Sequence, residues 1–208
     1  MAGACYAASD GAPWRCRYTA AMAIPRLRIE ETALLVIDMQ EKLLPSIADR
    51  QRVIRNCEVM LRMAGELGIP YLVTEHYPQG LGRTVQPVAA AMVDPAARIE
   101  KTRFSAAVAI VVDLLQSWRR TSVLLCGIEA QVCIMQTALD LQAAGRQCFV
   151  VSDAISATQT DQIAPALRRM EAAGAVTTGV MSAMYELLAD ARHPARRACV
   201  ELAKGIAR

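Results

Sequence analysis

Three residues of this chain have side chains suited to acid–base and nucleophilic chemistry, and each lies where a short apolar segment ends or a helix begins. Asp38 directly follows the apolar run 32–37, which is typical of a strand buried on both faces. Lys101 follows a weaker apolar segment, and Cys133 is expected in the first turn of a helix. There, free backbone N–H groups and the helix dipole favour the thiolate, which predicts a lowered pKa. The same N–H groups suit the oxyanion of a tetrahedral intermediate.

Together these groups predict covalent catalysis, but each also has a purely structural interpretation. Asp38 would act as the general base that takes the thiol proton, and Lys101 would keep the carboxylate ionised and stabilise negative charge. Alternatively, Asp38 is a helix cap or loop carboxylate, Lys101 is a surface charge, and Cys133 is a buried structural cysteine. Residue type and position alone leave both interpretations open.

The elements around these residues predict a three-layer α/β/α fold with a parallel sheet, of Rossmann-like type. Short apolar runs alternate with amphipathic segments, an order typical of right-handed βαβ units. In such sheets ligands bind beyond the carboxyl ends of the strands. Strands are predicted at 32–37, 69–74, 98–100, 122–126, 147–151 and 175–180, helices at 49–67, 105–118, 131–144, 161–173 and from 184 onward, and a loop at 77–82.

Composition and charge indicate a single α/β domain with a mainly aliphatic core and reduced cysteines. The chain has 208 residues, with 54% hydrophobic, 21% charged and only 4% aromatic residues. A net charge of +3, with acids and bases interspersed, argues against a nucleic-acid-binding protein. Seven irregularly spaced cysteines without a CxxC pair argue against a disulfide framework and a structural zinc site, and favour a cytoplasmic location.

The first 28 residues differ from the rest of the chain. They are rich in small residues, contain two prolines and show no clear apolar period. We expect a flexible extension over 1–28 and a single domain over 29–208. The extension lacks the apolar run of a signal peptide, although its arginines leave a mitochondrial presequence open. No apolar stretch is long enough to span a membrane.

Three segments resemble the signature segments of the isochorismatase-like cysteine hydrolases: LVIDMQ at 35–40, KTRFSA at 101–106 and GIEAQVC at 127–133. Each is weak alone, but they occur in the family's order, and the resemblance runs from about Ile29 to the C-terminal region. Three further segments resemble the branch of isochorismatase domain-containing proteins: 74–82, 124–131 and 190–194.

The resemblance implies a six-stranded parallel sheet, no cofactor, a homo-oligomer, and a catalytic triad of Asp38, Lys101 and Cys133. It also implies a cis peptide bond between Ile128 and Glu129, in the turn that would bind the oxyanion. The substrate pocket is expected to include Gln40, His76, Tyr77 and Phe104.

Two departures narrow the subgroup that the chain resembles. Nicotinamidases carry an Asp-x-His pair and a further His that bind a metal, whereas the matching segment here reads TEHYP and the chain has only two histidines. No metal is therefore expected. True isochorismatases lack the cysteine, so Cys133 argues against vinyl-ether hydrolysis.

The leading hypothesis is hydrolysis of a small amide or N-carbamoyl C–N bond through a covalent acyl-enzyme. The alternative is a catalytically weak or inactive member of the family that acts as a binding or scaffolding protein. An oxidoreductase that uses a nicotinamide cofactor is disfavoured, because no GxGxxG follows the first predicted strand.

Overall fold

The computed structural model describes residues 24–206. Most of the expected N-terminal extension, residues 1–23, lies outside this range. Within residues 24–28, Leu27 is buried, and the Arg26 guanidinium forms an ion pair with Glu186 at 2.7 Å. The last residues of the expected extension thus contact the domain.

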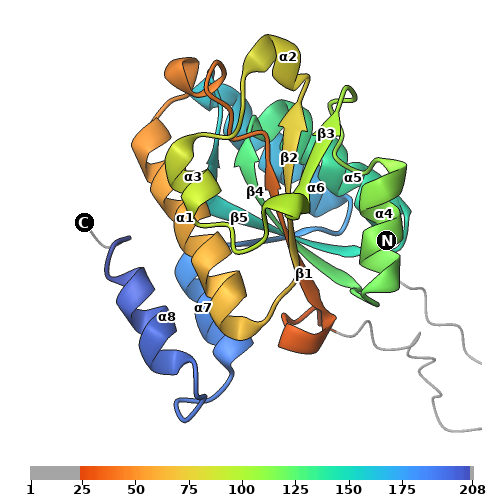
Figure 1. Ribbon diagram of the computed structural model, residues 1–208. Helices are drawn as coiled ribbons and strands as arrows, with labels where there is room; N and C mark the ends of the chain where they lie inside the picture. The colour runs from red at the N-terminus through yellow and green to blue at the C-terminus, as the bar shows by residue number, and fades with distance from the viewer. Residues whose placement is uncertain (1–23, 207–208) are drawn as a thin grey trace, which may run out of the picture.

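Six parallel strands form one sheet in the order β3-β2-β1-β4-β5-β6 (Figure 1). The chain builds the sheet outward from β1 through β2 to β3, then returns to place β4 on the other side of β1. The strand order therefore reverses between β1 and β4, and a crevice for ligands is expected beyond their carboxyl ends. The strands are β1 (Thr32–Ile37), β2 (Tyr71–His76), β3 (Arg98–Lys101), β4 (Ser122–Ile128), β5 (Gln147–Ser156) and β6 (Val176–Thr178).

Helices cover both faces of the sheet (Figure 1). One face packs against α1, α3, α7 and α8, and the other against α4, α5 and α6. A short helix, α2, lies at the carboxyl end of β2. The helices are α1 (Arg50–Leu67), α2 (Pro78–Leu81), α3 (Gln86–Ala90), α4 (Ala109–Ser117), α5 (Met135–Ala143), α6 (Ile163–Ala172), α7 (Val180–Leu188) and α8 (Arg196–Ala203).

The central strand β1 is apolar on both faces because both faces are covered. Leu34 and Val36 belong to the core on the α1 side, whereas Leu35 and Ile37 belong to the core on the α4 side. All six residues of β1 are buried. A continuous apolar run is therefore what this position requires, as the sequence predicted.

Several predicted boundaries need correction. The second strand begins at Tyr71 and continues to His76, and the segment predicted as a loop at 77–82 contains α2, which begins at Pro78. Proline is favoured in the first turn of a helix, where its missing N–H is not needed. The helix predicted from 184 starts at Val180, and α3 and α8 were not predicted.

Close packing at the carboxyl ends of β1 and β4 depends on Gly127. Its φ is +117°, in the range that favours glycine, and a Cβ atom there would lie 2.1 Å from the backbone oxygen of Ile37. Gly127 thus allows β4 to approach β1 immediately before Asp38. Among the helices of residues 24–206, none is both long and apolar enough to cross a membrane.

Candidate active site

Asp38 and Lys101 form a buried ion pair at the carboxyl edge of the sheet. The Lys101 Nζ lies 2.6 Å from the Asp38 Oδ2, and both side chains are fully buried. The Thr74 hydroxyl donates a 2.7 Å hydrogen bond to the other carboxylate oxygen, Oδ1. Asp38 also adopts a left-handed backbone conformation, with φ of 55°, which is uncommon for a residue other than glycine and often marks a functional site.

The Lys101 ammonium has three hydrogens, and the structure provides three acceptors for them. Besides Asp38, these are the backbone oxygens of Arg103 at 3.1 Å and Phe104 at 3.0 Å. Lys101 therefore has no N–H left for a substrate. It can act on the site through its charge and by fixing the position of Asp38.

Cys133 lies against this pair and is 6% exposed. The pKa of its thiol is raised to about 12, mainly by burial and also by the charge of Asp38 and a hydrogen bond with its carboxylate. The charge of Lys101 and a hydrogen bond from the backbone N–H of Glu129 act in the opposite direction. The expectation of a lowered pKa is therefore wrong, because desolvation and Asp38 outweigh Lys101 and the N–H of the turn.

The backbone before Cys133 forms an irregular turn, not the regular first turn of an α-helix. The expected cis peptide bond joins Ile128 and Glu129, and a π-helical segment, Ala130–Ile134, precedes α5. Ile128 is fully buried, so its side chain packs in the core. The Glu129 carboxylate accepts hydrogen bonds from the backbone N–H of Thr158 at 2.8 Å and from the Gln131 Nε2 at 3.0 Å.

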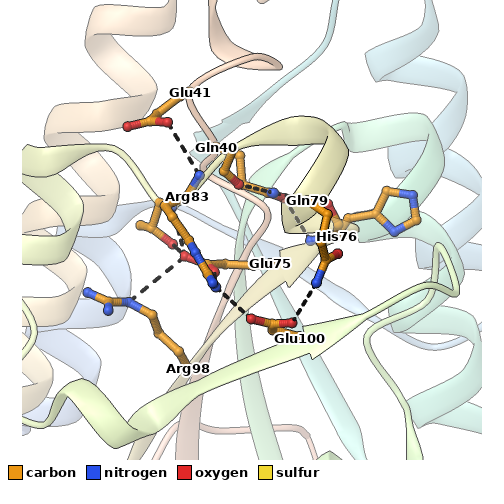
Figure 2. Close-up of polar contacts among 10 residues, drawn as sticks. Gln40, Glu41, Glu75, His76, Gln79, Arg83, Arg98 and Glu100 are labelled. Atoms are coloured by element: carbon orange, nitrogen blue, oxygen red, sulfur yellow. Dashed lines mark hydrogen bonds and ion pairs between the residues drawn. The ribbon is translucent and has the colours of Figure 1, made fainter.

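The residues expected in the substrate pocket divide into two groups. Gln40 is fully buried, and its amide bonds to the backbone of His76 and Gly82 (Figure 2). Both of its N–H groups are used there, so the structure places Gln40 in the support of the loop around α2. Tyr77 and Phe104 are about half exposed, at 53% and 52%. The rings of Phe104 and His76 are in contact, with centroids 5.3 Å apart.

A second buried carboxylate, Glu75, lies on the opposite face of β2 from His76 (Figure 2). It accepts hydrogen bonds from the backbone N–H and the hydroxyl of Thr84, at 2.8 and 2.7 Å, and from Arg83 at 2.9 Å. Burial alone would raise the pKa of Glu75, but these hydrogen bonds and the charge of Arg83 lower it on balance. Arg83 also binds Glu100 on β3, at 2.6 Å. These contacts hold the segment after α2 against β2 and β3.

An open hollow of about 480 Å³ lies between α2, the end of β3 and the start of α4. Tyr77, Lys101 and Ile110 contribute to its lining, but Cys133 does not. The hollow is therefore next to Lys101, and neither Asp38 nor Cys133 lines it. Over residues 24–206, no three His, Cys, Asp or Glu side chains are grouped so that they could hold a metal ion.

Three polar residues around the site were not singled out from the sequence. Thr74 bonds to Asp38, Gln131 bonds to Glu129, and the Thr137 hydroxyl donates to the backbone oxygen of Cys133 at 2.6 Å while accepting from the N–H of Ala106. Thr74 and Gln131 belong to segments that carried the family resemblance, which was the only signal available. No signal in the sequence indicated Thr137, because its role depends on its hydrogen bond with Ala106, in the loop that follows β3.

The fold and the site define the class of protein: a three-layer α/β protein with an acid, an amine and a thiol at the point where strand order reverses. The family model described as "Isochorismatase domain" matches residues 32–182. Isochorismatase domain-containing protein 2A of Mus musculus is 41% identical over 173 residues, which are 83% of this chain and 82% of that protein. The chain belongs to the isochorismatase domain family.

Solved structures agree with this assignment. The MAR1 ribonuclease of Caenorhabditis elegans superposes with a TM-score of 0.82 at 33% identity, covering 86% of this chain and 92% of that one. The YcaC gene product of Escherichia coli, described as an octameric hydrolase of unknown specificity, superposes with a TM-score of 0.81 at 24% identity and covers 89% and 92%. At 24% identity, the similarity to the YcaC gene product shows only a shared fold.

Proposed function

We propose that the protein is a cysteine-dependent hydrolase of a small amide or N-carbamoyl C–N bond, with Asp38, Lys101 and Cys133 as its catalytic triad. The observation that carries the proposal is the buried Asp38–Lys101 ion pair whose charges both act on the Cys133 thiol. A carboxylate that has the thiol as its neighbour can serve as its base.

The raised pKa of Cys133, about 12, requires that base. At neutral pH the resting cysteine is a thiol, so attack on a carbonyl must be coupled to removal of its proton. Asp38 takes this proton as the sulfur–carbon bond forms, and the carbonyl oxygen becomes an oxyanion. We assign the oxyanion to the backbone N–H groups of the turn at Glu129 and Cys133, because Lys101 has no free N–H.

The tetrahedral intermediate then collapses. The C–N bond breaks, and the proton on Asp38 passes to the departing nitrogen, which leaves as ammonia or an amine. A water molecule gives one proton to Asp38 and attacks the thioester carbon. The carbon–sulfur bond breaks, the carboxylic acid leaves, and the proton on Asp38 returns to the sulfur. Throughout, Lys101 holds Asp38 in place and balances its charge.

The decisive experiment measures hydrolysis by Cys133→Ala on a panel of amides, ureas and carbamoyl acids, with ammonia as the readout. Turnover and any covalent adduct should both disappear. Cys148→Ala is the matched control, because burial also raises the pKa of this strand cysteine to about 12. Hydrolysis retained in Cys133→Ala would eliminate the mechanism.

The same substrate panel also tests two alternatives to the cysteine hydrolase. A scaffolding protein would turn over no member of the panel in its wild-type form. A ribonuclease, the activity named for the Caenorhabditis elegans structure, would cleave single-stranded RNA added as a further substrate. A thiol that is only 6% exposed supports a small substrate over a polymer.

We also propose that the protein forms a homo-oligomer and is located in the cytoplasm. Self-association is supported by three exposed apolar side chains near the end of β3, those of Tyr77, Phe104 and Ile110. The location is supported by the cysteine content, and the mitochondrial alternative depends on residues 1–23, which the structure does not describe.

A further inference from the structure

A second open hollow, of about 490 Å³, lies at the amino ends of β2 and β3, the edge of the sheet opposite the proposed active site. It is lined by residues of 68–72, 94–97 and 114–120, and we call it the amino-edge hollow. Tyr71, at the start of β2, lies five strand residues from His76, which pairs with Lys101, a separation of about 16 Å. A small ligand in the amino-edge hollow therefore does not reach the Asp38–Lys101 pair.

Apolar side chains form much of the wall of the amino-edge hollow. Ile69 and Leu72 line it from the β2 side, and Leu114 and Trp118 line it from the C-terminal end of α4. The ring of Trp118 is only partly buried, so part of its apolar surface meets water. A ligand with an apolar body would cover these side chains and gain from the removal of both surfaces from water.

Arg120 supplies a positive charge to the same hollow. Its Nη1 donates hydrogen bonds to the backbone oxygens of Ile29, at 3.0 Å, and Glu30, which fix the position of the guanidinium. Within residues 24–206 its Nη2 has no hydrogen-bond partner, and no carboxylate lies within 4 Å of the guanidinium. Arg120 is thus a held cation whose charge is left for an anion, and a carboxylate suits a guanidinium well.

A hydroxyl group is a second free donor in the lining. The Tyr71 hydroxyl oxygen accepts the backbone N–H of Asp94 at 2.8 Å, but its own hydrogen has no acceptor within residues 24–206. The Asp94 carboxylate is the one acidic group in the lining, and its Oδ1 accepts the N–H of Ala96 at 2.8 Å. Asp94 is exposed to water, whereas Arg120 is half-buried, so the charge of Arg120 is the less screened of the two.

We propose that the amino-edge hollow is a binding site for a small organic carboxylate with an aromatic body. The carboxylate accepts hydrogen bonds from the Arg120 guanidinium and the Tyr71 hydroxyl, and the aromatic body packs against Trp118 and Leu114. The inference goes beyond the proposed function, because binding at this edge of the sheet requires neither Cys133 nor hydrolysis.

The test measures dissociation constants by isothermal titration calorimetry of the full chain. Three probes separate charge from apolar contact: 3-phenylpropanoate, the uncharged 3-phenylpropan-1-ol, and acetate, which lacks the apolar body. The main variant is Arg120→Gln, which keeps an N–H donor but loses the charge. Arg119→Gln is the matched control, because this neighbouring arginine is exposed and does not line the hollow. Tyr71→Phe removes the hydroxyl donor alone.

We expect the wild type to bind 3-phenylpropanoate at least about tenfold more tightly than either other probe, since only this probe offers both a carboxylate and an apolar body. Arg120→Gln should raise the Kd for 3-phenylpropanoate at least about tenfold, and Tyr71→Phe about threefold or more. Arg119→Gln should leave the Kd unchanged.

An equal Kd in Arg120→Gln and the wild type would overturn the inference, because the ligand would then bind elsewhere. An equal Kd for 3-phenylpropanoate and 3-phenylpropan-1-ol, or no binding of 3-phenylpropanoate by the wild type at about 10 mM, would also overturn it. If circular dichroism shows that Arg120→Gln does not fold, an unchanged Kd in Tyr71→Phe decides against the site. None of these results bears on the cysteine hydrolase, which Cys133→Ala tests separately.

Discussion

At the scale of single residues, the site contains two opposite charges that are buried together beside a thiol. Asp38 and Lys101 are both fully buried and 2.6 Å apart, and the thiol of Cys133 stays protonated beside them. Separating two such charges from water is costly unless they remain paired. Removing either member would therefore leave the other as a buried charge without its partner.

Lys101→Met should lower the free energy of unfolding by about 3–5 kcal/mol, because it leaves the Asp38 carboxylate buried without its counter-ion. Urea denaturation at neutral pH measures the change. The control is Lys42→Met, an exposed lysine whose Nζ contacts only the backbone oxygen of Gly80, and it should stay within about 0.5 kcal/mol of the wild type. Equal stability of the two variants would show that the buried pair contributes nothing to the fold.

The residues of the site could be predicted only in part from the sequence. Asp38, Lys101 and Cys133 were predicted to meet, and the structure places both charges so that they act on the thiol. The pKa of Cys133 was predicted in the wrong direction, because a sequence shows that a residue begins a helix but not how deeply it is buried. Gln40 was expected at the substrate, whereas its contacts depend on how the chain near Gly82 folds back.

At the scale of secondary-structure elements, the approach of β4 to β1 places the turn at Glu129 close to Asp38. Gly127→Ala should destabilise the protein by more than about 4 kcal/mol, because the added Cβ would lie 2.1 Å from the Ile37 oxygen. Thermal or urea unfolding measures the effect. Gly145→Ala is the matched control, since its φ is also positive, at +77°, but its Cβ would meet nothing within 4 Å.

We expect the Gly145 variant to cost about 1–2 kcal/mol, the price of a left-handed backbone conformation alone. If Gly127→Ala were no worse than Gly145→Ala, the two strands would not need their close approach.

Long elements could be predicted and short ones could not. β1 and α1 carry enough apolar residues at a regular spacing to reveal both their type and their position. α3 has only five residues, and α8 buries only the small side chains of Cys199 and Ala203. Such short or weakly apolar helices are stabilised by the surfaces on which they pack, so their own residues give little signal.

At the scale of the whole molecule, the order in which strands enter the sheet brings distant parts of the chain to one edge. Asp38 follows β1, Lys101 ends β3 and Cys133 follows β4, and the strand order reverses between β1 and β4. The alternation of strands and helices predicted a parallel sheet with a ligand site at its carboxyl edge, and the family resemblance predicted that the three residues meet there. The packing of residues 24–28 could not, because it depends on single contacts such as that of Arg26 with Glu186.

Self-association is the property of the whole molecule that the account predicts. Light scattering coupled to gel filtration should give a mass that is a multiple of 22.5 kDa. Phe104→Ser should lower the measured mass, because it removes one of the exposed apolar side chains near the end of β3. A wild-type protein that remains at 22.5 kDa over the micromolar range would contradict the prediction.

The measurement that tests the central claim most directly is the pH dependence of Cys133 alkylation by iodoacetamide in the wild type and in Asp38→Asn. The wild-type thiol, with its pKa of about 12, should react slowly at pH 8, where roughly one molecule in 10,000 carries the thiolate. Asp38→Asn removes a charge that raises this pKa and leaves the charge of Lys101, which lowers it. We therefore predict that the variant is alkylated at least about tenfold faster at pH 8, as mapped on the Cys133 peptide, while its hydrolytic activity is lost. An unchanged or slower alkylation rate in Asp38→Asn would contradict the account, because it would mean that the carboxylate and the thiol do not act on each other.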